Sequence, residues 1–317
     1  MVQLFAGSAG YLTPSPSPVL TIGNFDGVHL GHLHLLKRLV DTARKAGVPS
    51  CVYTFEPPPR VVLAPQQHQP RVLAWPDKLR LLGEAGVDHV IVERFTRAFA
   101  QHPPEWFAGV VLGARVAPSA LVVGYDFRFG RARQGDLALL RQTMPSVPIE
   151  QVHALTLDDE VVSSSVIRGL VAAGAVERAA TLLGRPHFLR GTVVQGDQRG
   201  RTIGFPTANL ETDSQLNPAD GVYAVRASID GGPALPAVAN LGVRPTVDGK
   251  RHLIEVHLLD DRAHELYGHE VVVSFVSRLR AERRFPDLDA LVAQIRADAA
   301  LARVRLGVSG DVPGEGA

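Results

Sequence analysis

The stretch Val19-Leu20-Thr21-Ile22-Gly23-Asn24-Phe25-Asp26-Gly27-Val28-His29-Leu30-Gly31-His32 decides the fold of the first half of the chain. Its apolar start predicts a buried strand, and the glycine-bearing loop that follows feeds a predicted helix. A helix that begins here presents backbone N–H groups and the positive end of its dipole, which suits a phosphate. His29 and His32 are three residues apart, so they would lie on neighbouring edges of the first helical turn. Gly31 would let a nucleotide approach the backbone closely.

Strands and helices alternate downstream of this stretch. Strand-like runs occupy 50–55, 89–95 and 120–127, and helical patterns occupy 36–43, 76–85 and 104–114. The proline-rich segment 13–18 before the stretch predicts a loop. This order predicts a parallel sheet, which binds ligands beyond the carboxyl ends of its strands. His29, the loop 56–59 and the segment 126–130 would all lie at that edge.

A second anion-binding helix start is predicted at 163–165, where three serines offer an N-cap and Arg168 follows about one turn inside. We expect this helix to continue to Leu183. Gly184-Arg185-Pro186 then ends it, so we place a domain boundary there and predict domains 1–184 and 185–306. Residues 307–317 read as a disordered tail.

The second half changes to short alternating runs separated by glycine, proline and asparagine. They span 188–194, 221–229, 237–241, 253–259 and 270–276. This pattern of short alternating runs and turn residues favours an antiparallel barrel. A final amphipathic helix would pack on the barrel through Leu288, Leu291, Val292, Ile295 and Ala299.

Four glycines and one arginine precede the run Phe205-Pro206-Thr207-Ala208-Asn209. They are Gly191, Gly196, Gly200, Arg201 and Gly204. Hairpin turns would explain a lone pair of glycines, but this density favours a loop whose N–H groups wrap phosphates. Thr207 and Asn209 are two apart along a predicted strand. Their side chains therefore face the same way and offer hard oxygens to Mg²⁺.

Glu255 and His257 share one face of the alternating strand Ile254-Glu255-Val256-His257-Leu258. A solvated barrel face is the ordinary interpretation of such a carboxylate. A carboxylate here would also serve to orient or deprotonate a hydroxyl during phosphoryl transfer. Spacing alone leaves both interpretations open.

Length and composition restrict the classes of function. A chain of 317 residues favours two domains, and 33 basic against 32 acidic residues leave no global positive field to attract nucleic acid. Cys51 is the only cysteine, which excludes an intrachain disulfide and fits a reducing compartment. No apolar run approaches the ~20 residues that span a bilayer, so we expect a cytoplasmic protein whose partners are small molecules.

The two histidines alone have other interpretations. They are equally compatible with a helix cap or adventitious metal binding, although no cluster of Cys, Asp or Glu completes a metal shell. The same His-x-Gly-His pattern occurs in class I aminoacyl-tRNA synthetases, which carry a lysine-serine loop late in the chain. Here the segment 163–168 follows within the same predicted domain instead.

An ordered series of motifs covers most of the chain. They lie at 23–32, 54–57, 95–100, 126–130 and 163–168, and then at 200–209, 221–223, 240–246, 255–257 and 279–280. Together they resemble the motifs of the bacterial bifunctional riboflavin kinases and FMN adenylyltransferases, also called FAD synthetases. The resemblance implies an α/β parallel-sheet nucleotidyltransferase domain followed by a six-stranded antiparallel β-barrel domain with a C-terminal helix. It further implies that the substrates are riboflavin, FMN and ATP, and that the metal is Mg²⁺.

The resemblance also implies roles for individual residues. The catalytic residues would be His29, His32 and Arg168 for adenylyl transfer, and Glu255 as the kinase base toward the terminal ribityl hydroxyl. The ATP contacts would be Gly23, Asn24, Phe25, Gly31 and Ser164 in the first site, and Gly191, Gly196, Gly200, Arg201 and Gly204 in the second. Flavin contacts would be Asp126, Phe127, Phe129 and Arg280, while Thr207 and Asn209 would hold Mg²⁺.

Two positions depart from the family pattern. Pro58 stands where many members have a histidine, and Val247 stands where a phenylalanine is common. Pro58 favours one alternative, an active kinase joined to a weak or inactive adenylyltransferase module. A non-enzymatic flavin-binding protein is the other alternative, but a scaffold has no physical need of all the predicted catalytic side chains.

Overall fold

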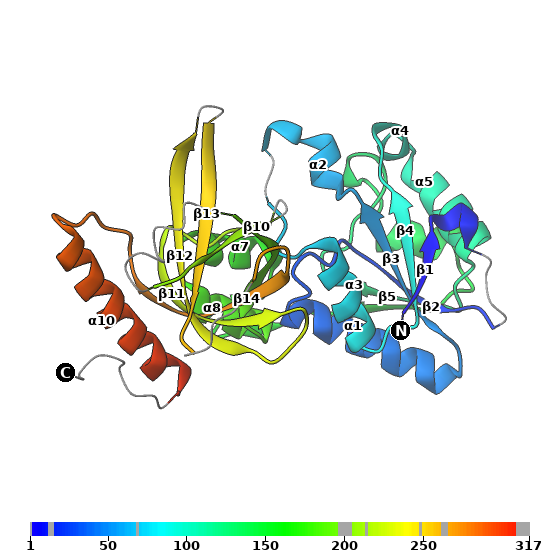
Figure 1. Cartoon of the computed structure of the whole chain (residues 1–317). Helices are drawn as coiled ribbons and strands as arrows, with labels where there is room; N and C mark the ends of the chain where they lie inside the picture. Colours follow the sequence, from blue (N-terminus) through cyan, green and yellow to red (C-terminus); the bar gives the residue numbers. More distant parts are fainter. Residues whose placement is uncertain are drawn as a thin grey trace. The chain divides into compact units, whose positions relative to one another are not determined.

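The computed structural model describes residues 2–11, 16–67, 70–195, 205–212, 215–246, 249–260 and 266–308, with the backbone alone at 243–246 and 249–252. These residues form two compact units (Figure 1). Unit 1 comprises residues 1–70 and 75–163, and unit 2 comprises residues 71–74 and 164–317. Some predicted positions lie outside the described residues. They are the ATP contacts Gly196, Gly200, Arg201 and Gly204, the family departure at Val247, and the predicted disordered tail from residue 309 on.

Unit 1 is built on a parallel sheet with strand order β1-β4-β3-β2-β5-β6. Its strands are β1 (Gln3–Ala6), β2 (Val19–Ile22), β3 (Ser50–Glu56), β4 (His89–Arg94), β5 (Ala120–Gly124) and β6 (Ile149–Val152). Every pairing in this sheet is parallel, which confirms the predicted sheet. The two edge strands, β1 and β6, were not predicted from the sequence.

The remaining elements of unit 1 surround this sheet. They are α1 (Leu30–Ala46), α2 (Pro59–Leu63), α3 (Trp75–Glu84), α4 (Arg97–Ala100), α5 (Pro104–Trp106), α6 (Leu137–Thr143), the 3-10 turns η1 (Ser8–Gly10), η2 (Pro65–Gln67) and η4 (Arg131–Arg133), and the small hairpin β7 (Thr156–Leu157) and β8 (Glu160–Val161). The helix predicted at 104–114 is present as α5 continued by a π-helix, η3 (Phe107–Val116). Leu20, Ile22 and Tyr53 of the sheet share one buried core with Phe107 and Leu112 of η3.

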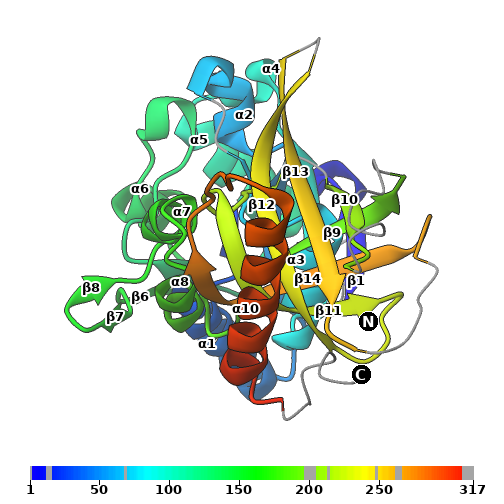
Figure 2. The ribbon, with the colours of Figure 1, turned by 60° about the vertical axis from the view of Figure 1, so that its left-hand side comes forward.

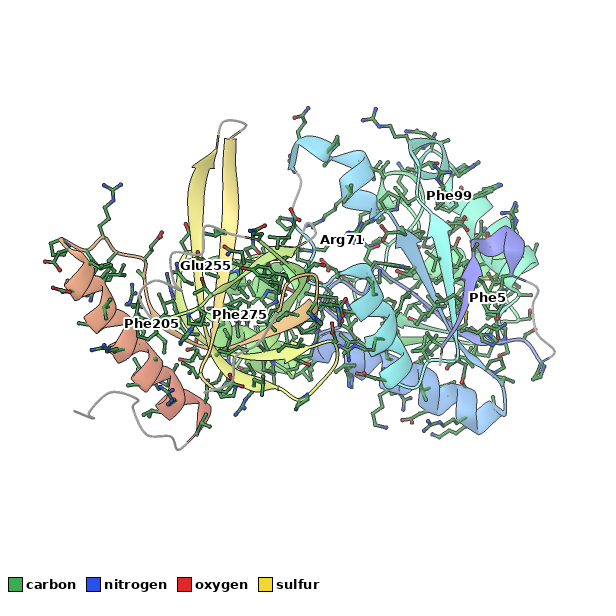
Figure 3. The ribbon with its side chains drawn as sticks, viewed as in Figure 1. Phe5, Arg71, Phe99, Phe205, Glu255 and Phe275 are labelled. Atoms are coloured by element: carbon green, nitrogen blue, oxygen red, sulfur yellow. The ribbon has the colours of Figure 1, made fainter. Side chains whose placement is uncertain are left out.

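Unit 2 contains a closed barrel with strand order β10-β13-β12-β11-β14-β9. The strands are β9 (His187–Val194), β10 (Ala208–Thr212), β11 (Gly221–Ile229), β12 (Leu235–Thr246), β13 (Gly249–Leu258) and β14 (Glu270–Arg280). All neighbours pair antiparallel, which confirms the predicted six-stranded barrel. Its interior is apolar. Phe275, labelled in Figure 3, packs edge to face with Tyr223 at 5.3 Å.

The single helix predicted from 163 to Leu183 is wrong, because the structure has two helices there, α7 (Ser164–Ala172) and α8 (Val176–Leu183). Gly174 separates them with φ of 78°, a left-handed conformation that glycine tolerates best. A Cβ at Gly174 would lie 2.8 Å from the Tyr223 hydroxyl, so a side chain would also collide with the barrel.

Barrel residues hold this helical hairpin. Arg278 of β14 donates from Nη1 to the Ala173 carbonyl at 3.3 Å, and its backbone N–H donates to Glu177 Oε1 at 3.0 Å. Val176 of α8 is buried in the same cluster as the barrel interior, and α8 packs on β14 (Figure 2). These contacts place both helices in unit 2, whereas the domain boundary at residue 184 stays a prediction.

The C-terminal helix α10 (Leu288–Leu306) is present as predicted, but the predicted packing face is wrong at its N-terminal end. Leu288 is 57% exposed, and the buried residues are Asp298, Ala299, Ala302 and Leu306. Asp298 is buried because Arg280 of β14 pairs with it at 2.8 Å. Among the described residues, no helix combines the length and apolar character needed to span a membrane.

Candidate functional site

The loop between β2 and α1 is strained and tightly packed. Phe25 and Val28 both have positive φ, 49° and 37°, and both side chains are buried. The loop is tied to the sheet where Gly23 N–H donates to the Tyr53 carbonyl at 3.0 Å. Backbone strain of this kind persists only where the surrounding structure enforces it, and it is common at ligand sites.

His29 is the N-cap of α1. Its Nδ1 accepts a hydrogen bond from the backbone N–H of His32 at 3.2 Å, and the two imidazole rings stack at 3.6 Å. A ring nitrogen that accepts from an N–H carries no proton, so the ring proton of a neutral His29 lies on Nε2. His29 therefore caps the helix, as one alternative had it, and in the same geometry presents an Nε2–H donor.

Two residues beside these histidines have packing roles. A Cβ at Gly31 would lie 3.0 Å from the Val162 carbonyl oxygen and 3.2 Å from the His29 ring. The space beside Gly31 is thus filled by protein, which differs from the predicted close approach of a nucleotide. Phe25, a predicted ATP contact, is buried at 5.2 Å from the His32 ring, while Asn24 is exposed.

Two polar groups at the carboxyl edge of the sheet were missed by sequence reasoning. Lys78 of α3 is 6% exposed, and its Nζ donates to Thr54 Oγ1 near the end of β3 at 3.0 Å. Tyr53 donates its hydroxyl to Glu93 Oε2 at 2.5 Å. A buried ammonium is costly unless it is well bonded, but Lys78 occupies a helical position that looks like a solvated charge in the sequence.

The predicted flavin segment follows β5 at the same edge. Asp126 is exposed and Phe127 is half-buried, but Phe129 is buried in the core of unit 1 and packs on Phe107. Phe129 also forms an isolated bridge with Gly135, whose absent side chain would collide with the Phe129 ring. Phe129 therefore fixes the loop, and the accessible ring is Phe127, stacked on it at 5.5 Å.

Ser164 and Arg168 lie on the first turns of α7 in unit 2. Both are partly exposed, and Arg168 Nη1 donates to the Ser164 carbonyl at 3.5 Å. The helix begins at Ser164, in agreement with the predicted serine-rich start.

A polar row crosses three neighbouring strands of the barrel around Glu255, the residue labelled in Figure 3. Asn209 of β10 and Asn240 of β12 both pair directly with Glu255 of β13. Directly opposite residues project from the same face of a sheet. This face points away from the barrel interior, because Leu210 and Ile254, the next residues along, belong to the core. Asn240 was not predicted as a site residue, since only the strand register reveals its place.

The chain before β10 is fixed against β13. His257 Nδ1 donates to the Pro206 carbonyl at 2.9 Å, and the Phe205 and His257 rings pack edge to face at 5.4 Å. Burial lowers the pKa of His257 below its ordinary range. Thr207 is partly exposed and follows directly.

Two predicted barrel contacts have structural roles. A Cβ at Gly191 would lie 2.3 Å from the Glu211 carbonyl oxygen, so β9 and β10 approach too closely there for any side chain. Arg280 makes a two-pronged ion pair with Asp298, and its guanidinium lies 5.6 Å from the Phe285 ring. In this geometry Arg280 joins the barrel to α10.

Comparison with protein families gives two matches along the chain. The FAD synthetase family model matches residues 13–166, and the riboflavin kinase family model matches residues 183–306.

Comparison with individual proteins gives similar relatives over nearly the whole length. The chain is 43% identical to the bifunctional riboflavin kinase/FMN adenylyltransferase of Escherichia coli K12, covering 93% of this chain and 95% of that protein. It is 37% identical to the protein of the same description from Bacillus subtilis, covering 88% and 90%. A solved Streptococcus pneumoniae structure, described as a macrolide-efflux protein, is 31% identical with a TM-score of 0.85 and covers 95% of this chain and 98% of that one.

Proposed function

The chain belongs to the family of bifunctional riboflavin kinases/FMN adenylyltransferases, and on that premise we propose which of its residues carry out the two reactions. The enzyme phosphorylates riboflavin to FMN with ATP, and it then transfers AMP from a second ATP to FMN, which gives FAD and pyrophosphate. We assign adenylyl transfer to residues 1–184 and the kinase reaction to residues 185–306.

In adenylyl transfer a phosphate oxygen of FMN attacks the α-phosphate of ATP and pyrophosphate leaves. Both reactants are anions, so the site must hold two negative groups together and offset the charge that develops. We assign this task to His29, His32 and Arg168, with Ser164 and the backbone of 23–31. The observation that supports His29 is its capping geometry, which directs a proton-bearing Nε2 away from the helix start. Asp126 and Phe127 form the flavin side, and Phe129 supports them from the core.

In the kinase reaction the terminal ribityl hydroxyl attacks the γ-phosphate of ATP and ADP leaves. We assign Glu255 as the base that takes the hydroxyl proton. The register carries this proposal, because Asn209 and Asn240 flank Glu255 on one face of the barrel.

Both reactions consume ATP, so a divalent metal belongs to this chemistry, and we propose Mg²⁺. The donor set around Glu255 fits it, since a Thr hydroxyl, an Asn carbonyl and a carboxylate are hard oxygen ligands. Thr207 and Asn209 would hold the ion, which neutralises phosphate charge when bound. Within the described residues, no three His, Cys, Asp or Glu side chains gather as a metal site, which is consistent with an ion that arrives with ATP.

A direct test is to incubate the purified protein with riboflavin, ATP and Mg²⁺ and to separate the flavins by chromatography. Glu255→Gln should abolish FMN formation and leave FAD formation from added FMN. His29→Ala should have the opposite effect. If His29→Ala stopped both steps equally, the assignment of the two reactions to separate modules would be wrong.

A further inference from the structure

His257 shares the catalytic face of the barrel with Glu255, two residues away on β13, and has no role in the chemistry above. The register pairs Asn209 with Glu255 and Ala208 with Val256. Extending it by one residue sets Thr207 opposite His257. Thr207 and Asn209 are thus the two polar residues of the β10 segment that face Glu255 and His257.

Thr207 lies outside the barrel ladder, because β10 begins only at Ala208. Ladder hydrogen bonds therefore fix Asn209 but not Thr207. The contact that fixes the chain at this point is the 2.9 Å hydrogen bond from His257 Nδ1 to the Pro206 carbonyl. That carbonyl belongs to the peptide group that joins Pro206 to Thr207. Since a peptide group is planar, holding its oxygen sets the direction in which Thr207 leaves.

A second contact supports the first. The Phe205 ring packs edge to face on His257 at 5.4 Å, so consecutive residues 205 and 206 are both held by one imidazole. A carbonyl oxygen can only accept, so Nδ1 must carry the proton. The imidazole thus holds the segment through one donated hydrogen bond and one ring contact.

We propose that His257 is a positioning residue of the kinase reaction, which holds the segment 205–207 so that the Thr207 hydroxyl points with Asn209 toward the Mg²⁺ of Mg-ATP. The inference rests on the proposed role of Thr207 as a metal ligand. It assigns His257 an effect on metal and nucleotide binding, and none on proton transfer by Glu255.

The matched variants are His257→Asn and His257→Leu. The two new side chains have nearly the same size, but only asparagine has an N–H near the position of Nδ1. The kinase rate is measured against Mg²⁺ and ATP concentration, with FAD formation from added FMN as a control. His257→Leu should raise the Mg²⁺ concentration for half-maximal kinase rate by about 10-fold, as expected for one lost hydrogen bond, and should change kcat less. His257→Asn should restore most of the Mg²⁺ affinity.

Equal Mg²⁺ dependence of the two variants would overturn the inference, as would a loss confined to kcat. A circular dichroism melt of each variant identifies a barrel that has failed to fold. In that event Phe205→Leu, which keeps His257 and removes only the ring contact, must shift the Mg²⁺ dependence in the same direction, and an unchanged dependence overturns the inference.

Thr207→Val distinguishes the proposed metal role of Thr207 from the proposed positioning role of His257. If it leaves the kinase unchanged, the metal role of Thr207 is wrong. If Thr207→Val weakens Mg²⁺ binding while His257→Leu and His257→Asn show the same Mg²⁺ dependence, only the role of His257 is wrong.

Discussion

The Val162 carbonyl and the His29 ring leave little room for a side chain at residue 31. A methyl group there would lie 3.0 Å from the Val162 carbonyl oxygen and 3.2 Å from the His29 ring, so these neighbours must shift slightly, the capping ring among them. We expect Gly31→Ala to lower FAD formation from FMN by about 10-fold to 100-fold, because small displacements of positioned groups are costly in catalysis. Kinase activity should be unchanged. Gly10→Ala is the control, since nothing lies within 4 Å of a Cβ at that glycine, and equal effects of the two substitutions would contradict the explanation.

A buried histidine in the barrel makes stability depend on pH. Burial lowers the pKa of His187 from its ordinary 6.5 to about 4, and its Nε2–H donates to the Leu216 carbonyl at 2.9 Å. Between pH 4 and pH 6.5 the His187 ring binds a proton in the unfolded chain but not in the folded chain. Proton uptake by the unfolded chain therefore lowers the free energy of unfolding by about 3 kcal/mol. This loss begins as the pH falls below 6.5 and is complete near pH 4.

Urea unfolding followed by circular dichroism at pH 7 and pH 4.5 measures this loss. His187→Gln keeps an N–H donor but does not titrate, so its midpoint should fall less between the two pH values. The exposed His153 is the control, and His153→Gln should behave as the wild type. An identical pH response of wild type and His187→Gln would show that His187 is not the cause.

Sequence motifs propose candidate site residues but do not separate ligand contacts from packing. Phe25, Phe129 and Gly191 were all predicted to contact substrates, yet their surroundings in the structure are protein. A motif records that a residue is needed and not which atoms it touches. His29 shows the opposite case, because its capping role follows from its position directly before a helix.

Among the elements, interior strands were predictable and edge strands were not. β2 is buried along its whole length and gives a continuous apolar run, whereas β1 is mostly exposed and has no such pattern. The break between α7 and α8 was also missed. Gly174 is an isolated glycine within a helical pattern, and its turn is enforced by Tyr223 and Arg278, which are distant in sequence.

The α7–α8 hairpin gives a prediction at the level of elements. Arg278 donates to the Ala173 and Asp220 carbonyls, at 3.3 Å and 2.8 Å, and so joins the hairpin to the barrel. Arg278→Gln removes charge-assisted hydrogen bonds from the helix pair that carries Arg168. We expect FAD formation from FMN to fall by about 10-fold, while FMN formation from riboflavin is retained.

Arg226 provides the matched control for this substitution. It also lies on the barrel and donates to a helix carbonyl, but that carbonyl is Leu306 of α10 at 2.8 Å. Arg226→Gln should leave FAD formation unchanged. The double variant of Arg278→Gln and Arg168→Gln should be no worse than Arg168→Gln alone, because both act through one helix. Additive losses would show that Arg278 acts by another route.

At the scale of the whole molecule, each unit has a hydrophobic core of its own. One core is centred on the parallel sheet and η3, and the other fills the closed barrel. His29 lies in the first unit and Glu255 in the second. A substitution at either of these two residues therefore should not unfold the other unit. The product of the first reaction is a small molecule that can be released and rebound.

These properties predict complementation between two inactive forms. Supplied with riboflavin, ATP and Mg²⁺, Glu255→Gln should make no flavin nucleotide, and His29→Ala should accumulate FMN without FAD. A mixture of the two proteins should make FAD, because FMN released by one molecule is adenylylated by the other. Chromatography of the flavins over time, with each variant alone as its control, measures this. If the mixture made only FMN while Glu255→Gln still converted added FMN to FAD, then FMN would have to pass between sites without entering solution.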